Sequence, residues 1–203
     1  MTALNQGLPR LRTLALLAVL GLAPLLQGCV EMAVVGAGAA AMASDDRRSV
    51  GAQTEDKEIG LRGESRIGDA FGDKAHVNVN SYNRNVLLTG EAPDAAAKTQ
   101  MERIVREIPN VRGVVNEIQV AGVSSYSARG NDAFITSKVK ARFVDNGSSF
   151  SVNQIKVVTE GSVVYLLGLL TRKEAEAAVE IARTTGGVQK VVRVFEYIEA
   201  PAK

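Results

Sequence analysis

The 203-residue sequence has one cysteine, one histidine and no tryptophan, and aromatic residues make up only 4% of it. A single cysteine cannot form an internal disulfide, and one cysteine with one histidine cannot supply the side-chain ligands of a usual zinc site. A Cys–His or Ser–His catalytic pair would have to use His76 itself. No other set of residues offers a nucleophile, a base and a group that orients the base, so we expect neither catalysis nor a cofactor. A hydrolase built on two carboxylates is a minor alternative, which would need both carboxylates close together in a deep cleft.

The charge of the chain is unevenly distributed. Lys and Arg total 24 and Asp and Glu total 22, which gives a net charge of +2. Both surplus charges are Arg10 and Arg12, because residues 1–28 contain no acidic side chain. The rest of the chain is neutral overall, but residues 30–58 hold 3 basic and 6 acidic side chains, whereas residues 132–198 hold 9 basic and 7 acidic ones. Any attraction to an anionic partner is therefore expected to be local to the second half.

Residues 1–28 have the pattern of a secretory signal. Two arginines precede an apolar run of 13 residues at 14–26, and a membrane-spanning helix would need about 20. The run ends in LQGC at 26–29, which is similar to the bacterial lipobox, where a signal peptidase cleaves before the cysteine. This resemblance implies that Cys29 carries lipid chains that anchor the protein, and Val30 in place of Asp implies the outer membrane. An unmodified cysteine after an ordinary signal is the alternative.

The segment after the cysteine shows no pattern of a folded domain. Residues 30–44 are rich in alanine and glycine, and residues 45–58 are polar without apolar periodicity. We therefore expect residues 29–58 to be the acylated cysteine followed by a flexible linker. A short alanine-rich helix lying on the lipid is the alternative for residues 30–44.

Residues 59–198 contain an internal repeat with an offset of 76 to 78 residues. The matched segments, first copy before second, are Arg66-Ile67 and Arg142-Phe143, Val77-Asn78-Val79 and Ile155-Lys156-Val157, VLLTG at 86–90 and VYLLG at 164–168, Ile104 and Ile181, and Val114-Val115 and Val191-Val192. Offsets that drift by one residue place insertions in turns, as expected for two copies of one domain. We predict domains at 59–120 and 132–198, a linker at 121–131 and a tail at 199–203.

Each copy is predicted to be an αββαβ unit. The expected elements are 59–71, 77–81, 86–89, 94–108 and 114–120 in the first copy, and 132–144, 155–159, 163–167, 172–184 and 191–198 in the second. In the helix at 132–144, with Asn131 or Asp132 as N-cap, Ile135, Val139 and Phe143 recur every four residues and are expected to face the sheet. The fold class is therefore α+β, with a three-stranded mixed sheet packed against two helices in each copy.

Several short motifs make this repeat resemble the BON domain. They are the strand-end glycines Gly90 and Gly168, the segment NEI at 116–118, and the turn GVQKV at 187–191. Two such domains behind an LQGC motif and a linker resemble the dual-BON outer-membrane lipoproteins. The resemblance implies a non-catalytic protein on the periplasmic face of the outer membrane, which binds anionic phospholipid such as phosphatidylglycerol or cardiolipin and supports envelope integrity.

In this family, lipid contact is attributed to the first helix of the second BON domain, here residues 132–144. The resemblance assigns lipid binding to Phe134, Ile135, Thr136, Lys138 and Val139, and the cations Lys140 and Arg142 would meet lipid phosphates. On a helical wheel Phe134 also points away from the buried stripe, whereas the first-copy helix has balanced charges and no aromatic at the matching position.

Two alternatives stay open. In one, Phe134 packs against the other domain and the helix is an ordinary solvated helix. In the other, the protein is an interaction module that docks on outer-membrane assembly or cell-division proteins. No contact with nucleic acid is expected, because a GxxG pattern at 60–63 is weak in a chain with 19 glycines.

Overall fold

The computed structural model describes residues 46–145 and 150–199. The predicted signal, Cys29 and most of the predicted linker lie outside the described residues. Residues Asp45–Lys203 form one compact unit. The hydrophobic clusters described below all lie inside this unit, so it contains its own core and is expected to fold without the residues that precede it.

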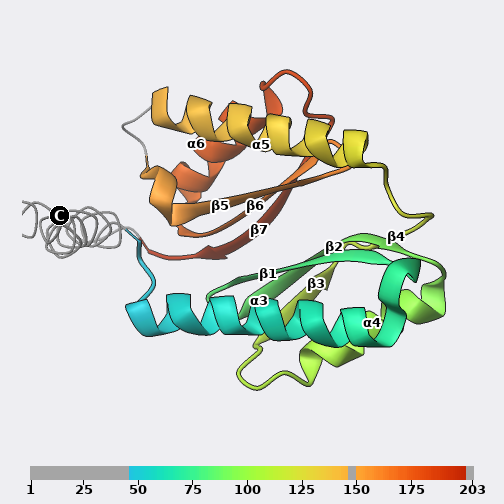
Figure 1. Cartoon of the computed structure of the whole chain (residues 1–203). Coiled ribbons are helices and arrows are strands. Elements are labelled where there is room, and N and C mark those ends of the chain that lie inside the picture. Colours follow the sequence, from blue (N-terminus) through green and yellow to red (C-terminus); the bar gives the residue numbers. More distant parts are fainter. Residues whose placement is uncertain (1–45, 146–149, 200–203) are drawn as a thin grey trace, which may run out of the picture. The chain divides into compact units, whose positions relative to one another are not determined.

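The first domain is a mixed sheet with two helices on one face (Figure 1). Strand β1 is antiparallel to β2, and the two short strands β3 and β4 both run parallel to β2. The elements are α3 (Val50–Phe71), a 3₁₀ turn (Gly72–Lys74), β1 (His76–Tyr82), β2 (Asn85–Ala92), α4 (Ala95–Arg106), β3 (Gly113–Asn116) and β4 (Gln119–Val120).

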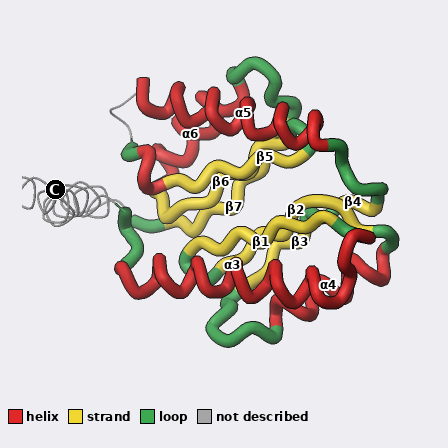
Figure 2. Tube along the Cα trace, in the orientation of Figure 1, coloured by secondary structure: helices red, strands yellow, loops and turns green. Residues whose placement is uncertain are grey.

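The second domain repeats this arrangement with three strands. Strand β5 is antiparallel to β6, and β7 is parallel to β6. The elements are α5 (Tyr126–Asp145), a 3₁₀ turn (Val152–Gln154), β5 (Ile155–Glu160), β6 (Val163–Leu170), α6 (Arg172–Arg183) and β7 (Lys190–Tyr197). Helices α5 and α6 both lie on one side of these strands (Figure 2). The predicted α+β class with two mixed sheets is confirmed.

The last strand of the first domain differs from the prediction. A single strand was expected at 114–120, but the structure has β3 and β4 with a break between them. At the break the Ile118 N–H donates to the Asn116 side-chain oxygen, at 3.2 Å, instead of to the sheet. The Ile118 side chain is fully buried in the core. The Glu117 N–H still donates to the Leu88 carbonyl on β2 at 2.9 Å, so the departure from the ladder is confined to the N–H of Ile118.

The buried side of α5 is the one that periodicity predicted. Ile135, Val139 and Phe143 are almost completely buried against the second sheet, which confirms the expected core-facing stripe. In α3 the corresponding buried residues are Ile59, Gly63 and Ile67. The glycine lets α3 approach the sheet closely, because a Cβ at position 63 would lie 2.8 Å from Val79 Cγ1.

A buried aspartate on α3 holds the β1–β2 hairpin. Asn83 and Arg84 form a two-residue turn with φ of 51° and 64°, which is the type I′ geometry of tight hairpins. The Asp56 carboxylate accepts both turn N–H groups, at 2.7 and 2.8 Å, and also the Ser81 hydroxyl at 2.5 Å and the Arg48 guanidinium at 2.8 Å. The Asp56 carboxylate thus connects α3 to the turn between β1 and β2.

The second domain uses the same device. Gly161 and Ser162 form the turn between β5 and β6, with φ of 55° and 63°. The Asp132 carboxylate on α5 accepts their N–H groups at 2.9 and 2.8 Å. Asp132 was expected as an N-cap and is instead a buried residue within the helix.

Both first helices begin earlier than predicted. Helix α3 begins at Val50 rather than at residue 59, so residues 50–58 are helical and do not belong to a flexible linker. Its N-cap is Ser49, whose side chain accepts the Ala52 N–H. Helix α5 begins at Tyr126 rather than 132, and the Ser125 hydroxyl accepts the Ala128 N–H. The predicted interdomain linker at 121–131 is therefore helical over its second half.

The two domains share a third hydrophobic cluster, formed by the sheet faces that their own helices leave uncovered. Its buried residues are Tyr82, Leu87, Tyr165, Leu167 and Leu169. Polar contacts accompany the cluster. The Tyr82 hydroxyl donates to the Gln154 carbonyl at 2.9 Å, and Arg47 donates to the Leu169 carbonyl and to both Glu174 carboxylate oxygens at 2.7–2.8 Å. The two copies therefore dock on each other through packed side chains.

Candidate functional site

The outer side of α5 carries large apolar side chains that no other part of the described chain covers. Phe134 is 62% exposed, and Tyr126 and Val144 are exposed on the same helix. Because successive residues turn by 100°, all three point about 140° away from the centre of the buried stripe. The exposure of Phe134 also contradicts the alternative in which it packs against the first domain.

Two lysines flank this outer side. The Lys138 ammonium lies 5.0 Å from the centre of the Phe134 ring and donates to the Gly186 carbonyl. Lys140, on the other flank, is exposed and makes no hydrogen bond or ion pair with any described residue. The helix is therefore edged by positive charge on both flanks of its apolar outer side.

Over residues 126–144 no exposed carboxylate opposes these cations, and the exposed Asp145 lies at the carboxyl end of α5. Between Tyr126 and Val144 the single acidic residue is Asp132, and its carboxylate is buried under the β5–β6 turn. An anionic surface would therefore approach α5 without meeting an exposed negative charge within this stretch.

Several of the residues predicted to bind lipid face inward. Ile135 and Val139 are buried in the core, so they offer no surface to a lipid, and this part of the prediction is corrected. Thr136 donates its hydroxyl to the Thr159 hydroxyl on β5 at 2.7 Å. The family resemblance assigned lipid binding to nearly consecutive residues of the helix. Consecutive residues of a helix point in different directions, so only some of them can face a lipid surface.

Arg142 also has a structural partner. Its guanidinium donates to the Ile181 carbonyl at 2.9 Å and to the hydroxyls of Thr184 and Thr185 at 3.0 and 2.9 Å. These acceptors lie at the carboxyl end of α6, where a positive charge is stabilised by the helix dipole. Arg142 therefore ties α5 to α6, and Phe134, Lys138 and Lys140 are the predicted site residues that remain at the surface.

Sequence reasoning missed Tyr126, because the helix was expected to begin after it. The signal that could have found it is Ser125, which is a good N-cap residue three positions before Ala128. Among residues 46–145 and 150–199, no group of three or more His, Cys, Asp or Glu side chains is placed to hold a metal ion.

The corresponding helix of the first domain has a different outer side. With the repeat offset of 76, Glu58 on α3 takes the place of Phe134, and it pairs with Arg62 at 3.3 Å. Glu64 takes the place of Lys140. Leu61 is the large apolar residue exposed near the middle of α3. The α3 surface is therefore mixed in charge.

Comparison with known proteins agrees with this architecture. The family model for the BON domain matches residues 63–122 and again residues 131–199. The chain belongs to the BON-domain family. Each match begins within the first helix of a domain, α3 or α5, and extends past its last strand.

This BON-domain chain is similar to two curated proteins over most of its length. It is 34% identical over 191 residues to the outer membrane lipoprotein DolP of Haemophilus influenzae, covering 93% of this chain and 97% of that protein. It is 33% identical over 156 residues to a 21 kDa hemolysin of Actinobacillus pleuropneumoniae, covering 76% and 80%. Among solved structures, CdsD of the Chlamydia trachomatis type III secretion system matches with 11% identity and a TM-score of 0.29, over 71% of this chain and 94% of CdsD.

Within the described residues, no helix of the BON-domain protein combines the length and the apolar character needed to cross a bilayer.

Proposed function

We propose that this BON-domain protein is a non-catalytic envelope lipoprotein that contacts anionic phospholipid through the outer side of α5. The lipid on Cys29 would hold it at the periplasmic face of the outer membrane, and α5 would then meet phosphatidylglycerol or cardiolipin headgroups and so support envelope integrity. The similarity to DolP, an outer membrane lipoprotein, supports the location.

The exposed Phe134 carries the proposal. Moving a phenylalanine side chain from water into an apolar environment is favourable by about 1.5–3 kcal/mol. Inserted at the level of the headgroups, it would bring the flanking Lys138 and Lys140 to the depth of the lipid phosphates. Each such lysine contributes about 1 kcal/mol near an anionic surface, so neither the ring nor the charges act alone.

A flotation assay with the soluble unit 45–203 tests this function. The protein is mixed with phosphatidylcholine vesicles with and without phosphatidylglycerol, and we expect binding only to the anionic vesicles, weakening as salt is added. Phe134→Glu should reduce this binding roughly tenfold or more, because it replaces an inserting ring with a negative charge.

The matched control is Leu61→Glu on α3. Leu61 is 69% exposed, much as Phe134 is, but it lies on the helix with mixed charge. We expect Leu61→Glu to leave vesicle binding nearly unchanged. Equal binding to both kinds of vesicle, or equal loss in the two variants, would contradict the proposal. A protein partner retained by Phe134→Glu in crosslinking would favour the interaction module instead.

A further inference from the structure

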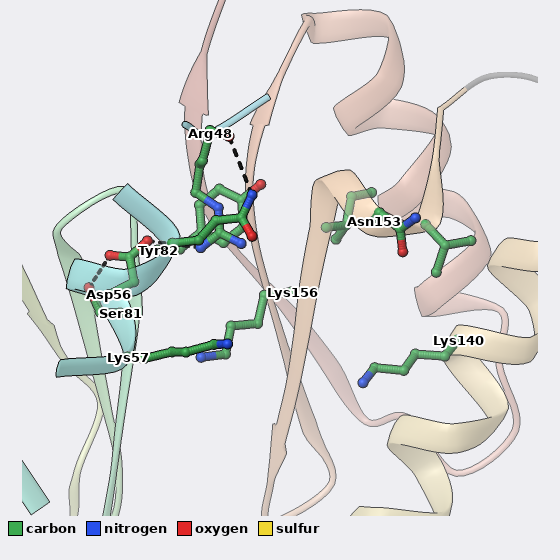
Figure 3. A pocket seen from close by; sticks show the side chains of 11 residues that line it. Arg48, Asp56, Lys57, Ser81, Tyr82, Lys140, Asn153 and Lys156 are labelled. Carbon is green, nitrogen blue, oxygen red and sulfur yellow. Dashed lines mark hydrogen bonds and ion pairs between the residues drawn. The ribbon is translucent and has the colours of Figure 1, made fainter. Parts of the chain in front are cut away.

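A basic pocket lies where the two domains meet, and it shares Lys140 with the flank of the outer side of α5. It has a volume of about 470 Å³. One wall comes from the segment before α3, from α3 itself and from the end of β1, and the opposite wall comes from α5, the 3₁₀ turn and β5. The lining residues labelled in Figure 3 include Arg48, Lys57, Lys140 and Lys156.

Positive charge in this pocket exceeds negative charge. Four cations line it, and the single lining carboxylate is Asp56. That carboxylate already accepts four hydrogen bonds from Arg48, Ser81 and the hairpin turn, so it has little capacity left for the lysines. Arg48 is also fixed, since it pairs with Asp46 and lies 3.8 Å from the centre of the Tyr82 ring.

The three lysines of the pocket have no such partners. Within residues 46–145 and 150–199, neither Lys57 nor Lys140 nor Lys156 makes a hydrogen bond or an ion pair. In Figure 3 the Lys57 and Lys156 side chains end close to each other, and Lys140 extends from α5 toward the β5 strand from its other side. Three ammonium groups, with nine N–H donors in total, thus line the pocket without a hydrogen-bond acceptor among the described residues.

Lys156 is the least exposed of the three lysines. Its side chain is half-buried on β5, at the face of the sheet that looks toward the first domain. Burial lowers the pKa of Lys156, and the positive charge of Arg48 lowers it further. A bound anion would oppose both effects, because it favours the charged form of the ammonium.

From this geometry we propose that the pocket between the domains binds a phosphate-bearing anion through Lys57, Lys140 and Lys156. Lysines present compact charges that suit a phosphate group approached from several sides. Tyr82, Val152 and Ile155 add apolar wall beside the cations, which suits the carbon part of a phosphate ester. The source of the phosphate is a lipid headgroup or a soluble ester.

Calorimetric titration of the unit 45–203 with sn-glycerol 3-phosphate, and with inorganic phosphate, tests the site. We expect saturable binding of both probes and roughly tenfold weaker binding in Lys57→Gln and in Lys156→Gln, since each variant loses one charged hydrogen bond. Lys57 is exposed, so its variant keeps the test valid if Lys156→Gln does not fold. Lys173→Gln, an exposed lysine on α6, is the matched control and should bind like the parent protein.

A side-chain NMR titration of Lys156 gives a second readout. Because the pKa of Lys156 is lowered in the free protein, the bound anion should raise it. Absence of binding by both probes, or equal binding in Lys57→Gln, Lys156→Gln and Lys173→Gln, would overturn the proposal.

Vesicle flotation distinguishes the two sources of phosphate. If Lys57→Gln lowers binding to phosphatidylglycerol vesicles as well as to the soluble ester, the occupant is a lipid headgroup. If it lowers only binding of the ester, the occupant is soluble. Phe134→Glu should leave binding of sn-glycerol 3-phosphate unchanged, so this site and the outer side of α5 can fail independently. Lys140 belongs to both surfaces and is therefore left intact in these tests.

Discussion

Helices α3 and α5 occupy the same place in two copies of one domain, yet only their inner sides are alike. Asp56 and Asp132 each hold a hairpin turn, and isoleucine stands at both matching positions of the buried stripe, Ile59 and Ile135. On the outer side the two copies differ in kind, with acidic residues on α3 where α5 has an aromatic ring and a lysine. The inner side packs on the sheet and the hairpin turn in both copies, whereas the outer side has no such partner and its residues differ.

The largest expected difference between the copies concerns their buried aspartates. Asp56 accepts four hydrogen bonds, one of them from a charged guanidinium, whereas Asp132 accepts two from backbone N–H groups. Asp56→Ala removes one of the two carboxylate partners of Arg48 and leaves the N–H groups of the hairpin turn without their acceptor. We therefore expect it to lower the free energy of unfolding by about 4 kcal/mol. Asp132→Ala should cost about 2 kcal/mol.

Urea unfolding of the unit 45–203 measures both effects as shifts in midpoint at constant slope. Asp69→Ala, an exposed aspartate on α3, is the control and should stay within about 0.5 kcal/mol of the parent. Equal costs for Asp56→Ala and Asp132→Ala would mean that the extra contacts of Asp56 add no stability.

A second difference is the residue at the middle of each buried stripe, Gly63 on α3 and Val139 on α5. Because a Cβ at position 63 would lie 2.8 Å from Val79 Cγ1, Gly63→Val should lower the free energy of unfolding by about 2 kcal/mol despite its better helix propensity. The clash is specific, so the cost of Gly63→Val should fall when Val79→Ala is already present. Additive costs in that double-mutant cycle would show that the close approach of α3 and β1 is not what excludes a side chain.

The start of the second helix also differs between the copies. Both α4 and α6 have a side-chain N-cap, but α6 adds Glu174, which completes a capping box and pairs with Arg47 at 2.7 Å. The Arg47 guanidinium lowers the pKa of Glu174 to about 2 from the usual 4.5. A lowered pKa in the folded state means that the ionised carboxylate stabilises the fold. This contribution is complete above about pH 4.5 and is lost as the pH falls toward 2.

We therefore expect Glu174→Gln to lower the free energy of unfolding at neutral pH by about 1 kcal/mol, since the pair is only partly shielded from water. Unfolding measured from pH 7 to 2 should show a smaller decline in this variant than in the parent. Glu180→Gln removes an exposed pair with Arg183 on the same helix and serves as the control. A full acid-dependent decline in Glu174→Gln would refute the assignment.

Much of the fold could be predicted because the two copies show the same order of helices, strands and turns. The turn residues, the helix that follows each hairpin and the stripe of Ile135, Val139 and Phe143 all follow from local chemistry and period. The start of α3 was missed because residues 45–58 are polar and lack apolar periodicity, and tertiary contacts such as those of Asp56 stabilise the helix there instead. The same offset that matched Arg66 to Arg142 also matches Asp56 to Asp132, and extending it upstream would have indicated the longer helix.

The candidate site was harder to predict from the sequence than the fold. Helical geometry separates Phe134 from Ile135 although the two are neighbours in the chain, and only one of them reaches the surface. The basic pocket was missed altogether, because Lys57 and Lys156 lie in different copies about a hundred residues apart and meet only when the domains dock.

The smallest expected effect comes from transferring the aromatic ring from α5 to α3. In a Phe134→Glu background, Glu58→Phe places a ring at the equivalent position of the first copy, and we expect it to restore binding to phosphatidylglycerol vesicles by only about threefold. Glu64 remains beside it where α5 has Lys140, and its negative charge opposes approach to an anionic surface. Adding Glu64→Lys should increase the recovery further, whereas Glu58→Phe alone should bind phosphatidylcholine vesicles no better than before. Complete recovery from Glu58→Phe alone would mean that an exposed ring suffices and that the flanking lysines of α5 contribute nothing.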